Sequence, residues 1–401
     1  MALLPVAEAL ERMLVDVRAC GTETVPLAEA AGHILAEPLV ALRTQPPFAA
    51  SAMDGYAVRA SDVERTPAQL SMMGAAAAGR QFAGSVATGE AVRIFTGAPV
   101  PEGADTIAIQ ENVRVIDETT IEVLESVAVG RHIRARGLDF SEGDRLLERQ
   151  RTLDPAALSL AAAANYPHLP VIKRPLVAVI ATGDELLPPG SIAGPGQIIA
   201  SNSYGVAAIA LQAGAQVLDL GIVPDRLELI EVAIGKALAA GADVVVTLGG
   251  ASVGDHDLVH RALTGLGMEL GFWKIAMRPG KPLMFGLLDD TRCLGLPGNP
   301  VASLVCSHLF LKPLLARLAG RPDVDETIDA TLGADMPAND IRQDYVRAHL
   351  VQTESGPSAT PFNTQDSSML RTMAEARCLI IREPHAPAAP AGTRCRVLPL
   401  R

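Results

Sequence analysis

The sequence predicts a multidomain α/β plus β protein, centred on a three-layer α/β/α doubly wound domain. An inserted β subdomain, an N-terminal helical region and a C-terminal β-barrel-like module complete the expected fold. Strand-like and helix-like segments alternate regularly over 173–322, which is typical of a largely parallel sheet covered by helices. Short β-type runs between Gly, Pro and acidic turns fill 44–136 and recur over 323–401. With 401 residues, the chain is long enough for roughly two to four domains.

The N-terminal helical region is expected to be discontinuous, formed by 1–43 and 137–172. Apolar residues recur at helical spacing over 6–17, and a second helix is expected over 27–36. A third begins at Asp154, where an N-cap is followed by proline, and we expect it to pack on the first two. The β subdomain, 44–136, then lies between them in the chain. Its expected strands are 91–95, 106–110, 113–116 and 121–124.

The α/β domain, 173–322, is expected to contain both strands and helices in alternation. Its expected strands are 176–181, 217–223, 243–248, 282–287 and 293–296. Its expected helices are 203–213, 227–239, a short one near 258–263, and 301–318. The C-terminal module, 323–401, is expected to be built from strands at 326–332, 345–351, 377–382 and 394–398.

The composition argues against binding to nucleic acid or to a membrane. The net charge of -11 repels anionic polymers and lipids, and 3% aromatic residues leave little surface for stacking on bases. No apolar stretch approaches transmembrane length, and Glu8 and Glu11 lie where a signal peptide would be basic and apolar. The five cysteines lack C-x-x-C spacing, so we expect a reducing, cytoplasmic setting with neither disulfides nor a zinc site.

Polar loops follow several of the predicted parallel strands. They are 182–185, 224–225, 249–257 and 296–300. Each alone has a structural explanation: Asp184 as a turn residue, Asp225 as an N-cap, and Pro300 as the first residue of a helix. Because open α/β sheets bind ligands beyond the carboxyl ends of their strands, all of these loops on one edge predict a binding site.

The loop 249–257 combines glycines with acids. Gly249, Gly250 and Gly254 would allow backbone N–H groups to approach a phosphate at the start of the next helix. Asp255 and Asp257 would repel that phosphate unless a cation lay between, so the loop predicts phosphate binding through Mg²⁺. The alternative is that Asp255 is only an N-cap and Asp257 only a first-turn acid.

A cationic turn supplies the opposite charge. Lys274, Arg278 and Lys281 surround prolines that restrict the backbone, which favours a preorganised oxyanion site over a solvated basic face. Carboxylates for a metal beside cations for an oxyanion are suited to chemistry at a phosphoanhydride. The sequence contains no Walker A or G-x-G-x-x-G pattern and no apparent serine or cysteine nucleophile beside a histidine.

These motifs together resemble the molybdopterin molybdenumtransferase family, the MoeA family, which is similar to the E domain of gephyrin. The resemblance covers essentially the whole chain. The matching motifs are Ser51-Ala-Met-Asp-Gly-Tyr56, Thr96-Gly-Ala-Pro99, Thr182-Gly-Asp-Glu185, Gly249-Gly-Ala-Ser-Val-Gly254, Pro279-Gly-Lys-Pro282 and Leu296-Pro-Gly-Asn-Pro300. Each motif is weakly specific alone, whereas their order along one chain is highly specific.

The resemblance implies insertion of molybdenum from molybdate into the dithiolene of adenylylated molybdopterin, with Mg²⁺-dependent release of AMP. It also implies a homodimer whose β subdomain completes the partner's site, together with a supplier of adenylylated molybdopterin and acceptor molybdoenzymes. The implied catalytic residues are Asp54, Glu185, Asp225 and Asp257, with Asp257 and Glu185 as metal ligands. The implied substrate-binding residues are Thr96, Arg134, Asp139, Thr182, Gly183, Asp184, Gly249, Gly250, Ser252, Lys274, Arg278, Lys281, Pro297, Asn299, Pro300, Arg347 and Ser367.

Within this resemblance, Asp54, Thr96, Arg134 and Asp139 would come from the partner, and Arg347 and Ser367 would approach the oxyanion from the C-terminal module. Three positions depart from similar proteins: Arg278 replaces a usual lysine, His256 a variable or aromatic residue, and Asp366 a common glycine. Alternative readings are a molybdopterin adenylyltransferase, which resembles the α/β domain alone, and a non-catalytic scaffold on the same fold.

Overall fold

The computed structural model describes residues 3–249, 257–322 and 324–400, which form two compact units. The α/β unit comprises Met1–Glu23, Gly32–Ile34 and Val171–Arg401, and the β unit comprises Thr24–Ala31 and Leu35–Pro170. Strands β1 (Thr22–Pro26) and β12 (His168–Ile172) pair where the chain passes between the units. The predicted domain boundaries are finer than this division and stay a prediction.

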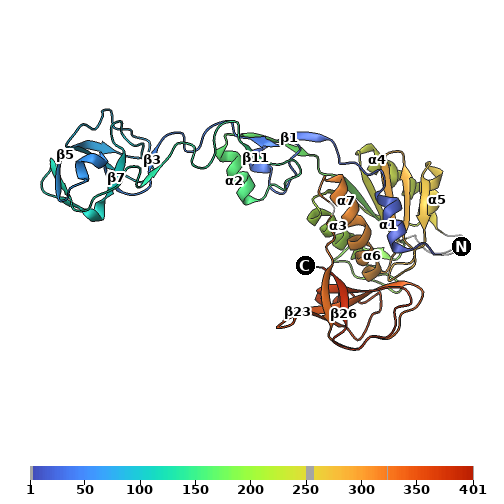
Figure 1. The fold of residues 1–401 in the computed structure, drawn as a ribbon. Helices are drawn as coiled ribbons and strands as arrows, with labels where there is room; N and C mark the ends of the chain where they lie inside the picture. The colour runs from blue at the N-terminus through green and yellow to red at the C-terminus, as the bar shows by residue number, and fades with distance from the viewer. Residues whose placement is uncertain (1–2, 250–256, 323, 401) are drawn as a thin grey trace. The chain divides into compact units, whose positions relative to one another are not determined.

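A six-stranded sheet of order β16-β13-β17-β21-β20-β18 forms the centre of the α/β unit (Figure 1). The first four of these strands pair in parallel, whereas β20 is antiparallel to both β21 and β18. Their bounds are β13 (Leu176–Thr182), β16 (Gln216–Val223), β17 (Val244–Leu248), β18 (Glu269–Trp273), β20 (Met284–Leu288) and β21 (Thr291–Leu296). Strand β17 is buried along its whole length, as expected for a strand with helices on both faces.

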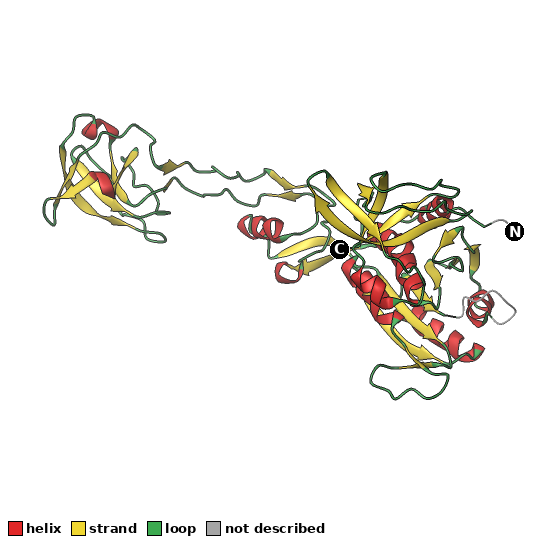
Figure 2. Ribbon diagram, turned by 90° about the horizontal axis from the view of Figure 1, so that it is seen from below, coloured by secondary structure: helices red, strands yellow, loops and turns green. Residues whose placement is uncertain are grey.

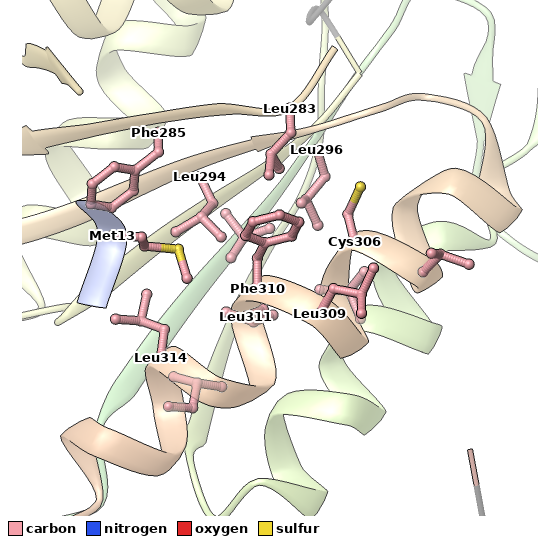
Figure 3. Packing of buried hydrophobic residues seen from close by; sticks show 14 of the residues in the cluster. Met13, Leu283, Phe285, Leu294, Leu296, Cys306, Leu309, Phe310, Leu311 and Leu314 are labelled. Carbon is pink, nitrogen blue, oxygen red and sulfur yellow. The ribbon is translucent and has the colours of Figure 1, made fainter. Parts of the chain in front are cut away.

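Alternate residues of the central strands enter two separate cores. Val177 and Val179 of β13 pack on one face of the sheet, while Ala178 and Ile180 pack on the other. The first core is covered by α1 (Val6–Leu14), α3 (Asn202–Gln212), α6 (Pro300–Cys306) and α7 (Lys312–Leu318), and the second by α4 (Leu227–Ala239) and α5 (Leu258–Gly265). Figure 3 shows the first core, in which Phe310 packs among Leu283, Leu294 and Leu296.

The predicted helix 301–318 is present but contains a π-helical segment, η4 (Ser307–Leu311), between α6 and α7. The N–H of Lys312 donates to the carbonyl of Ser307, five residues earlier. Pro313 lacks an N–H, and its ring would clash with the carbonyl four residues earlier in a regular helix, so the wider turn accommodates it. The helix Pro300–Leu318 has the length and hydropathy of a membrane span, but 67% of it is buried, as in the core helix of a folded domain.

Helix α1 contradicts one packing expectation. Val6, Ala9 and Met13 lie on one side of it and are buried in the first core, where the helix contacts α7 and β18. The helix beginning at Asp154, α2 (Pro155–Ala163), belongs to the β unit and contacts η1 (Leu27–Glu29) instead. The apolar side of α1 is thus buried in the larger core of the α/β unit and not against α2.

The expected helix over 27–36 is also wrong, because only the 3₁₀ turn η1 forms there. The N–H groups of Leu27, Leu35 and Ala36 donate to carbonyls of Pro167, Arg151 and Pro170, far along the chain. These tertiary bonds replace the bonds within a helix that the local periodicity suggested.

The C-terminal module is a closed barrel-like sheet, as predicted. Strands follow the order β23-β24-β22-β26-β25, and pairing between β25 and β23 closes the ring, while β19 (Met277–Arg278) pairs with β23 outside it. The barrel strands are β22 (Ile328–Leu332), β23 (Gln343–Thr353), β24 (Gly356–Pro361), β25 (Cys378–Arg382) and β26 (Arg394–Pro399), with α8 (Leu370–Glu375) before β25. Tyr345, Leu379 and Leu398 belong to the first core, so the module packs directly on the α/β domain.

The β unit is built mainly from strands, with short helices between them (Figure 2). Its six-stranded sheet has the order β7-β4-β6-β5-β9-β8. These strands are β4 (Gly55–Val58), β5 (Ala68–Ala76), β6 (Glu90–Ile94), β7 (Thr106–Ile109), β8 (Val113–Val115) and β9 (Thr120–Val123), with the turns η2 (Ala60–Val63) and η3 (Gln110–Asn112). Two short ribbons pair β3 (Ala50–Ser51) with β10 (Ile133–Arg134), and β2 (Leu39–Val40) with β11 (Arg145–Leu147).

The observed architecture confirms the predicted fold class, with a doubly wound α/β domain, an inserted β subdomain and a C-terminal barrel-like module. The N-terminal helical region is reduced to α1, the turn η1 and α2.

Candidate functional site

A cavity of about 720 Å³ lies at the carboxyl ends of the parallel strands in the α/β unit. The register aligns these ends, because Thr182 pairs with Val223, Ala181 with Leu248, and Leu248 with Leu296. The predicted site residues that line the cavity are Thr182, Gly183, Glu185, Asp225, Gly249, Pro297, Asn299 and Pro300. The alternation of strands and helices therefore brought the predicted strand-end loops to one place.

The loops after β13 and β16 bring three carboxylates, Asp184, Glu185 and Asp225, near one another. Gly183 has φ +153°, and a Cβ there would lie 2.5 Å from Oε2 of Glu185, so glycine leaves room for the carboxylate. The N–H of Asp225 donates to Oδ1 of Asp184 at 3.1 Å. Burial, together with the charges of Asp184 and Glu185, raises the pKa of Asp225 above its usual value. Crowded carboxylates of this kind favour a cation or a proton among them.

The loop after β21 is fixed from both sides. Nδ2 of Asn202, the first residue of α3, donates to the carbonyl of Gly298 at 2.8 Å. Nδ2 of Asn299 donates to Oγ of Ser367 at 3.0 Å, and the N–H of Val301 donates to the carbonyl of Ser367 at 3.1 Å. The C-terminal module thus reaches the strand-end edge, as the expected role of Ser367 requires.

Ser368, next to the predicted Ser367, lines the cavity. The hydroxyl of Ser368 donates to Oδ1 of Asp366, and its N–H donates to the same oxygen at 2.8 Å; both bonds lower the pKa of Asp366. Asp366 is exposed and serves the turn that leads towards α8. The hydroxyl of Ser367 accepts a hydrogen bond from the Asn299 amide. Of the two neighbouring serines, Ser368 therefore lines the cavity and Ser367 fixes the loop.

Arg347 of β23 is a buried cation. Its side chain is 1% exposed, and neither Nη1 nor Nη2 has a hydrogen-bond partner in the described part of the chain. Its Nε donates to Oε1 of Gln365 at 3.2 Å. Burial lowers the pKa of Arg347, while the charges of Asp366 and Asp344 oppose that shift. A buried guanidinium with unpaired N–H groups favours an anion beside it.

The cationic turn is closed by backbone hydrogen bonds. The N–H of Ile275 donates to the carbonyl of Lys281 at 2.9 Å, and Pro282, which follows Lys281, lines the cavity. Lys281 is exposed and forms no ion pair with any residue that the structure describes.

Arg278 differs from the two lysines of the turn. It pairs with Asp344 and, at 3.5 Å, with Asp340, and the bond to Asp344 raises its pKa. Arg278 therefore ties the turn to the C-terminal module, which an ammonium with its single charged atom would do less rigidly.

Asp257 is the N-cap of α5, a role that the alternative interpretation of the sequence assigns to Asp255. Its Oδ1 accepts the N–H of His260 at 2.9 Å. The residue is 4% exposed, its Oδ2 has no hydrogen-bond partner among the described residues, and burial raises its pKa. An unpaired buried carboxylate oxygen fits a cation ligand, although the described ranges contain no group of three or more His, Cys, Asp or Glu side chains placed to hold a metal. Gly250, Ser252, Gly254, Asp255 and His256 lie outside the described residues.

The remaining predicted residues lie in the β unit. The N–H and Oγ1 of Thr96 both donate to Oδ1 of Asp54 at 2.8 Å, and these bonds lower the pKa of Asp54. Arg134 and Asp139 line a separate cavity of about 380 Å³ with Gly97. The four predicted residues of this unit therefore gather in and beside one pocket.

Sequence reasoning missed several residues of the main cavity, namely Ile198, Ile199, Ser201, Asn202, Ser203, Pro282 and Ser368. The sequence around Ile198 lacks a motif, and in the structure β14 (Leu186–Leu187) and β15 (Ile198–Ile199) form a separate two-stranded sheet. Asn202 had a usable signal, since a polar residue that opens a helix after a strand commonly lies at the ligand edge.

Comparison with known proteins matches the chain to family models along most of its length. The matches are the MoeA N-terminal region (domain I and II) at residues 4–165, a probable molybdopterin binding domain at 178–317, and the MoeA C-terminal region (domain IV) at 329–400. A molybdopterin molybdenumtransferase of Haemophilus influenzae is 35% identical over 94% of this chain and 94% of its own. One from Bacillus subtilis is 33% identical over 98% of this chain and 91% of its own.

Solved structures give the same result. A crystal structure of a molybdopterin biosynthesis MoeA protein from Pyrococcus horikoshii is 29% identical and covers 100% of both chains, with a TM-score of 0.84. The sequence matches extend through all parts of the fold, including the β unit and the barrel. This chain belongs to the molybdopterin molybdenumtransferase (MoeA) family.

Proposed function

We propose that the protein transfers molybdenum from molybdate to the dithiolene of adenylylated molybdopterin, with Mg²⁺-dependent cleavage of the adenylate and release of AMP. Its family identifies it as a transferase of molybdenum cofactor biosynthesis, which inserts molybdenum. The adenylylated substrate and the fate of the nucleotide are additions of the proposal.

The cavity at the strand ends carries this proposal. Its volume of about 720 Å³ is within the range of roughly 300–1,000 Å³ that suits a small organic ligand. Glu185 and Asp225 line it, and the turn that bears Lys281 adjoins it at Pro282. Cleavage of the phosphoanhydride that joins AMP to the pterin phosphate, beside a bound molybdate, needs this combination of carboxylates and cations.

Hydrogen-bonding side chains of the cavity would orient the ligand. Ser201, Ser203 and Ser368 line its wall and offer hydroxyl groups, while Asn202 and Asn299 already fix the loop that forms its floor. The buried guanidinium of Arg347, connected to this edge through the segment 362–368, would compensate the charge of the oxyanion.

Asp257 and Glu185 are the proposed ligands of Mg²⁺. Oδ2 of Asp257 has no hydrogen-bond partner among the described residues, which supports this role, and magnesium commonly takes one or two protein carboxylates together with phosphate oxygens and water. The bound ion would neutralise charge on the phosphoanhydride as AMP departs. Asp225, whose pKa is raised, would be the carboxylate most ready to hold a proton at this edge.

We also propose a homodimer in which the β unit of one subunit completes the site of its partner. Support comes from the β-unit cavity, where Arg134 and Asp139 add polar groups beside the turn of Asp54 and Thr96. The five free cysteines support a cytoplasmic location. A supplier of adenylylated molybdopterin and acceptor molybdoenzymes are the proposed partners.

AMP release tests the reaction directly. Purified protein would be given adenylylated molybdopterin, Mg²⁺ and molybdate, and AMP would be measured by chromatography. The proposal expects AMP release that depends on both molybdate and Mg²⁺. No release with verified substrate would refute it, whereas formation of adenylylated molybdopterin from ATP would indicate an adenylyltransferase, and binding without turnover a scaffold.

Subunit mixing tests the shared site. Asp257→Asn damages the α/β part of a site, and Asp54→Asn damages the proposed β-unit part. In a mixed dimer, one site receives both damaged parts and the other receives neither, so mixing two inactive variants should restore AMP release. Activity that stays absent in verified mixed dimers would show that Asp54 and Asp257 serve the same subunit's site.

A further inference from the structure

We propose that Trp273 is a positioning residue that holds the ammonium group of Lys274 ready for the oxyanion; this inference rests on the proposed function, with Lys274 as one of the cations of the predicted oxyanion turn. Trp273 ends β18 and is the only tryptophan in the chain. Nζ of Lys274 lies 4.9 Å from the centroid of its ring, within the distance of a cation–π contact. No family motif quoted for this chain includes Trp273.

The backbone of Lys274 is already fixed, so the contact with the ring controls the side chain. Lys274 has φ +72°, in the left-handed region, and its N–H donates to the carbonyl of Leu283 at 3.0 Å. Its carbonyl accepts the N–H of Leu4 at 3.4 Å. A lysine has four freely rotating side-chain bonds, and a ring contact reduces the number of rotamers that must be lost when an anion binds.

The indole is held in turn by ring packing and by its strand. The imidazole of His260, on α5, stacks on it with centroids 4.9 Å apart and an interplanar angle of 21°. Trp273 pairs with Met284 of β20, while its Nε1 is buried and finds no hydrogen-bond partner in the described ranges. The ring is therefore oriented by His260 and by the sheet, with no hydrogen bond to the described residues.

The same contacts connect the two charge types of the site. The N–H of His260 donates to Oδ1 of Asp257, so the proposed metal ligand and the imidazole that stacks on Trp273 lie in the first turn of α5. A purely structural reading would treat Trp273 as packing of an edge strand. That reading predicts that replacing any large buried side chain of β18 by a smaller one lowers the free energy of unfolding to a similar extent. It predicts no loss of anion binding that is specific to Trp273.

Molybdate binding separates the two readings. Trp273→Phe retains an aromatic ring with a weaker attraction for cations, and Trp273→Leu removes the ring. Phe272→Leu is the matched control, because Phe272 is the neighbouring residue of β18. Phe272 is buried, its ring centroid lies 5.5 Å from that of Phe285, and its ring contacts no cation in the described structure. Dissociation constants for molybdate would be measured by equilibrium dialysis for the full-length protein, with circular dichroism to verify folding.

We expect Trp273→Phe to weaken molybdate binding by about three- to tenfold, and Trp273→Leu by more, because the cation–π contact is lost in steps. At saturating molybdate, Trp273→Phe should retain the kcat of the unmodified protein, so the change appears in KM. Phe272→Leu should bind molybdate within about twofold of the unmodified protein even though its packing is impaired. Normal binding in both Trp273 variants, or an equal loss in Phe272→Leu, would overturn the proposal.

The emission of the single tryptophan gives an independent measurement. Added molybdate should change the fluorescence of Trp273 with the same dissociation constant that dialysis gives, and Lys274→Met should abolish that change. Binding by dialysis without any change in emission would overturn the assignment. If the unmodified protein releases no AMP but the Trp273 variants bind molybdate more weakly, the positioning role of Trp273 holds and the proposed reaction fails. If the protein releases AMP but the Trp273 variants bind molybdate normally, the proposed reaction holds and the positioning role fails.

Discussion

Replacing Asp257 by asparagine separates its role as a helix cap from its proposed role as a metal ligand. Asparagine caps helices about as well as aspartate, whereas alanine costs about 1 kcal/mol of stability. Burial raises the pKa of Asp257 above the ordinary 3.8, so the metal-free protein loses stability as the pH rises through that value and the raised one. Asp257→Asn should therefore leave the free energy of unfolding at pH 7 unchanged or raise it, and Asp257→Ala should offset that gain with the lost cap.

The matched control is Asp154, the N-cap of α2. Its Oδ1 accepts the N–H of Ala157 at 2.8 Å, in the same geometry as Asp257, but its side chain is 39% exposed and pairs with Arg151. Urea unfolding with and without Mg²⁺ would be combined with measurement of AMP release. At a concentration a hundred times its dissociation constant, Mg²⁺ should raise the free energy of unfolding of the unmodified protein by about 2.7 kcal/mol. Asp154→Asn should keep this stabilisation, and Asp257→Asn should lose it.

Asp257→Asn should also abolish Mg²⁺-dependent AMP release, while Asp154→Asn should not. If Asp257→Asn keeps both the metal effect and turnover, the carboxylate is only a cap, and the free Oδ2 has no catalytic meaning.

Two further predictions concern the charges of the site. Arg347→Met replaces a buried guanidinium by an apolar side chain of similar length. The free energy of unfolding should be unchanged or higher, because Nη1 and Nη2 have no partner among the described residues and a buried charge without partners is costly. Molybdate should then no longer stabilise the protein; a strongly destabilised variant that still responds to molybdate would identify Arg347 as structural. For Asp225, AMP release at subsaturating Mg²⁺ should rise with pH through its raised pKa as the carboxylate ionises. Asp184→Asn removes a neighbouring negative charge and should move that rise to lower pH, and a profile that does not move contradicts the assigned cause.

The parallel sheet was predictable because its strands are short, largely apolar runs that alternate with helices of ordinary length. Strand β18 was missed: its sequence, Glu269–Trp273, has glycine at its centre and no clear alternation, and only its pairing with β20 makes it a strand. The expected helix over 27–36 failed for the related reason that its N–H groups found distant carbonyls. Local patterns predict elements well when their hydrogen bonds are local, and poorly when tertiary partners compete.

The strand-end loops were predictable for the same reason as the sheet, and the structure gathers most of their predicted residues at one cavity. The family resemblance supplied Arg347, but its burial and its free donors depend on how the barrel closes and docks on the core. The bond between Asn299 and Ser367 joins positions 68 residues apart. No local pattern predicts a contact of this range.

The π-helical segment between α6 and α7 can be understood as one residue more than a regular helix needs. The buried positions of α6 continue to Leu309 and Phe310, and then resume at Leu314, Leu315 and Leu318. At regular spacing, Pro313 and Arg317 would follow Leu309 towards the core, whereas Arg317 instead donates Nη1 to the carbonyl of Leu14 at 2.8 Å. A chain with one residue fewer here would have a regular helix, and the buried sides of α6 and α7 could both face the core only if the chain also lacked the proline. Alignment with such a chain would therefore require a one-residue gap inside a buried helix, far from any loop.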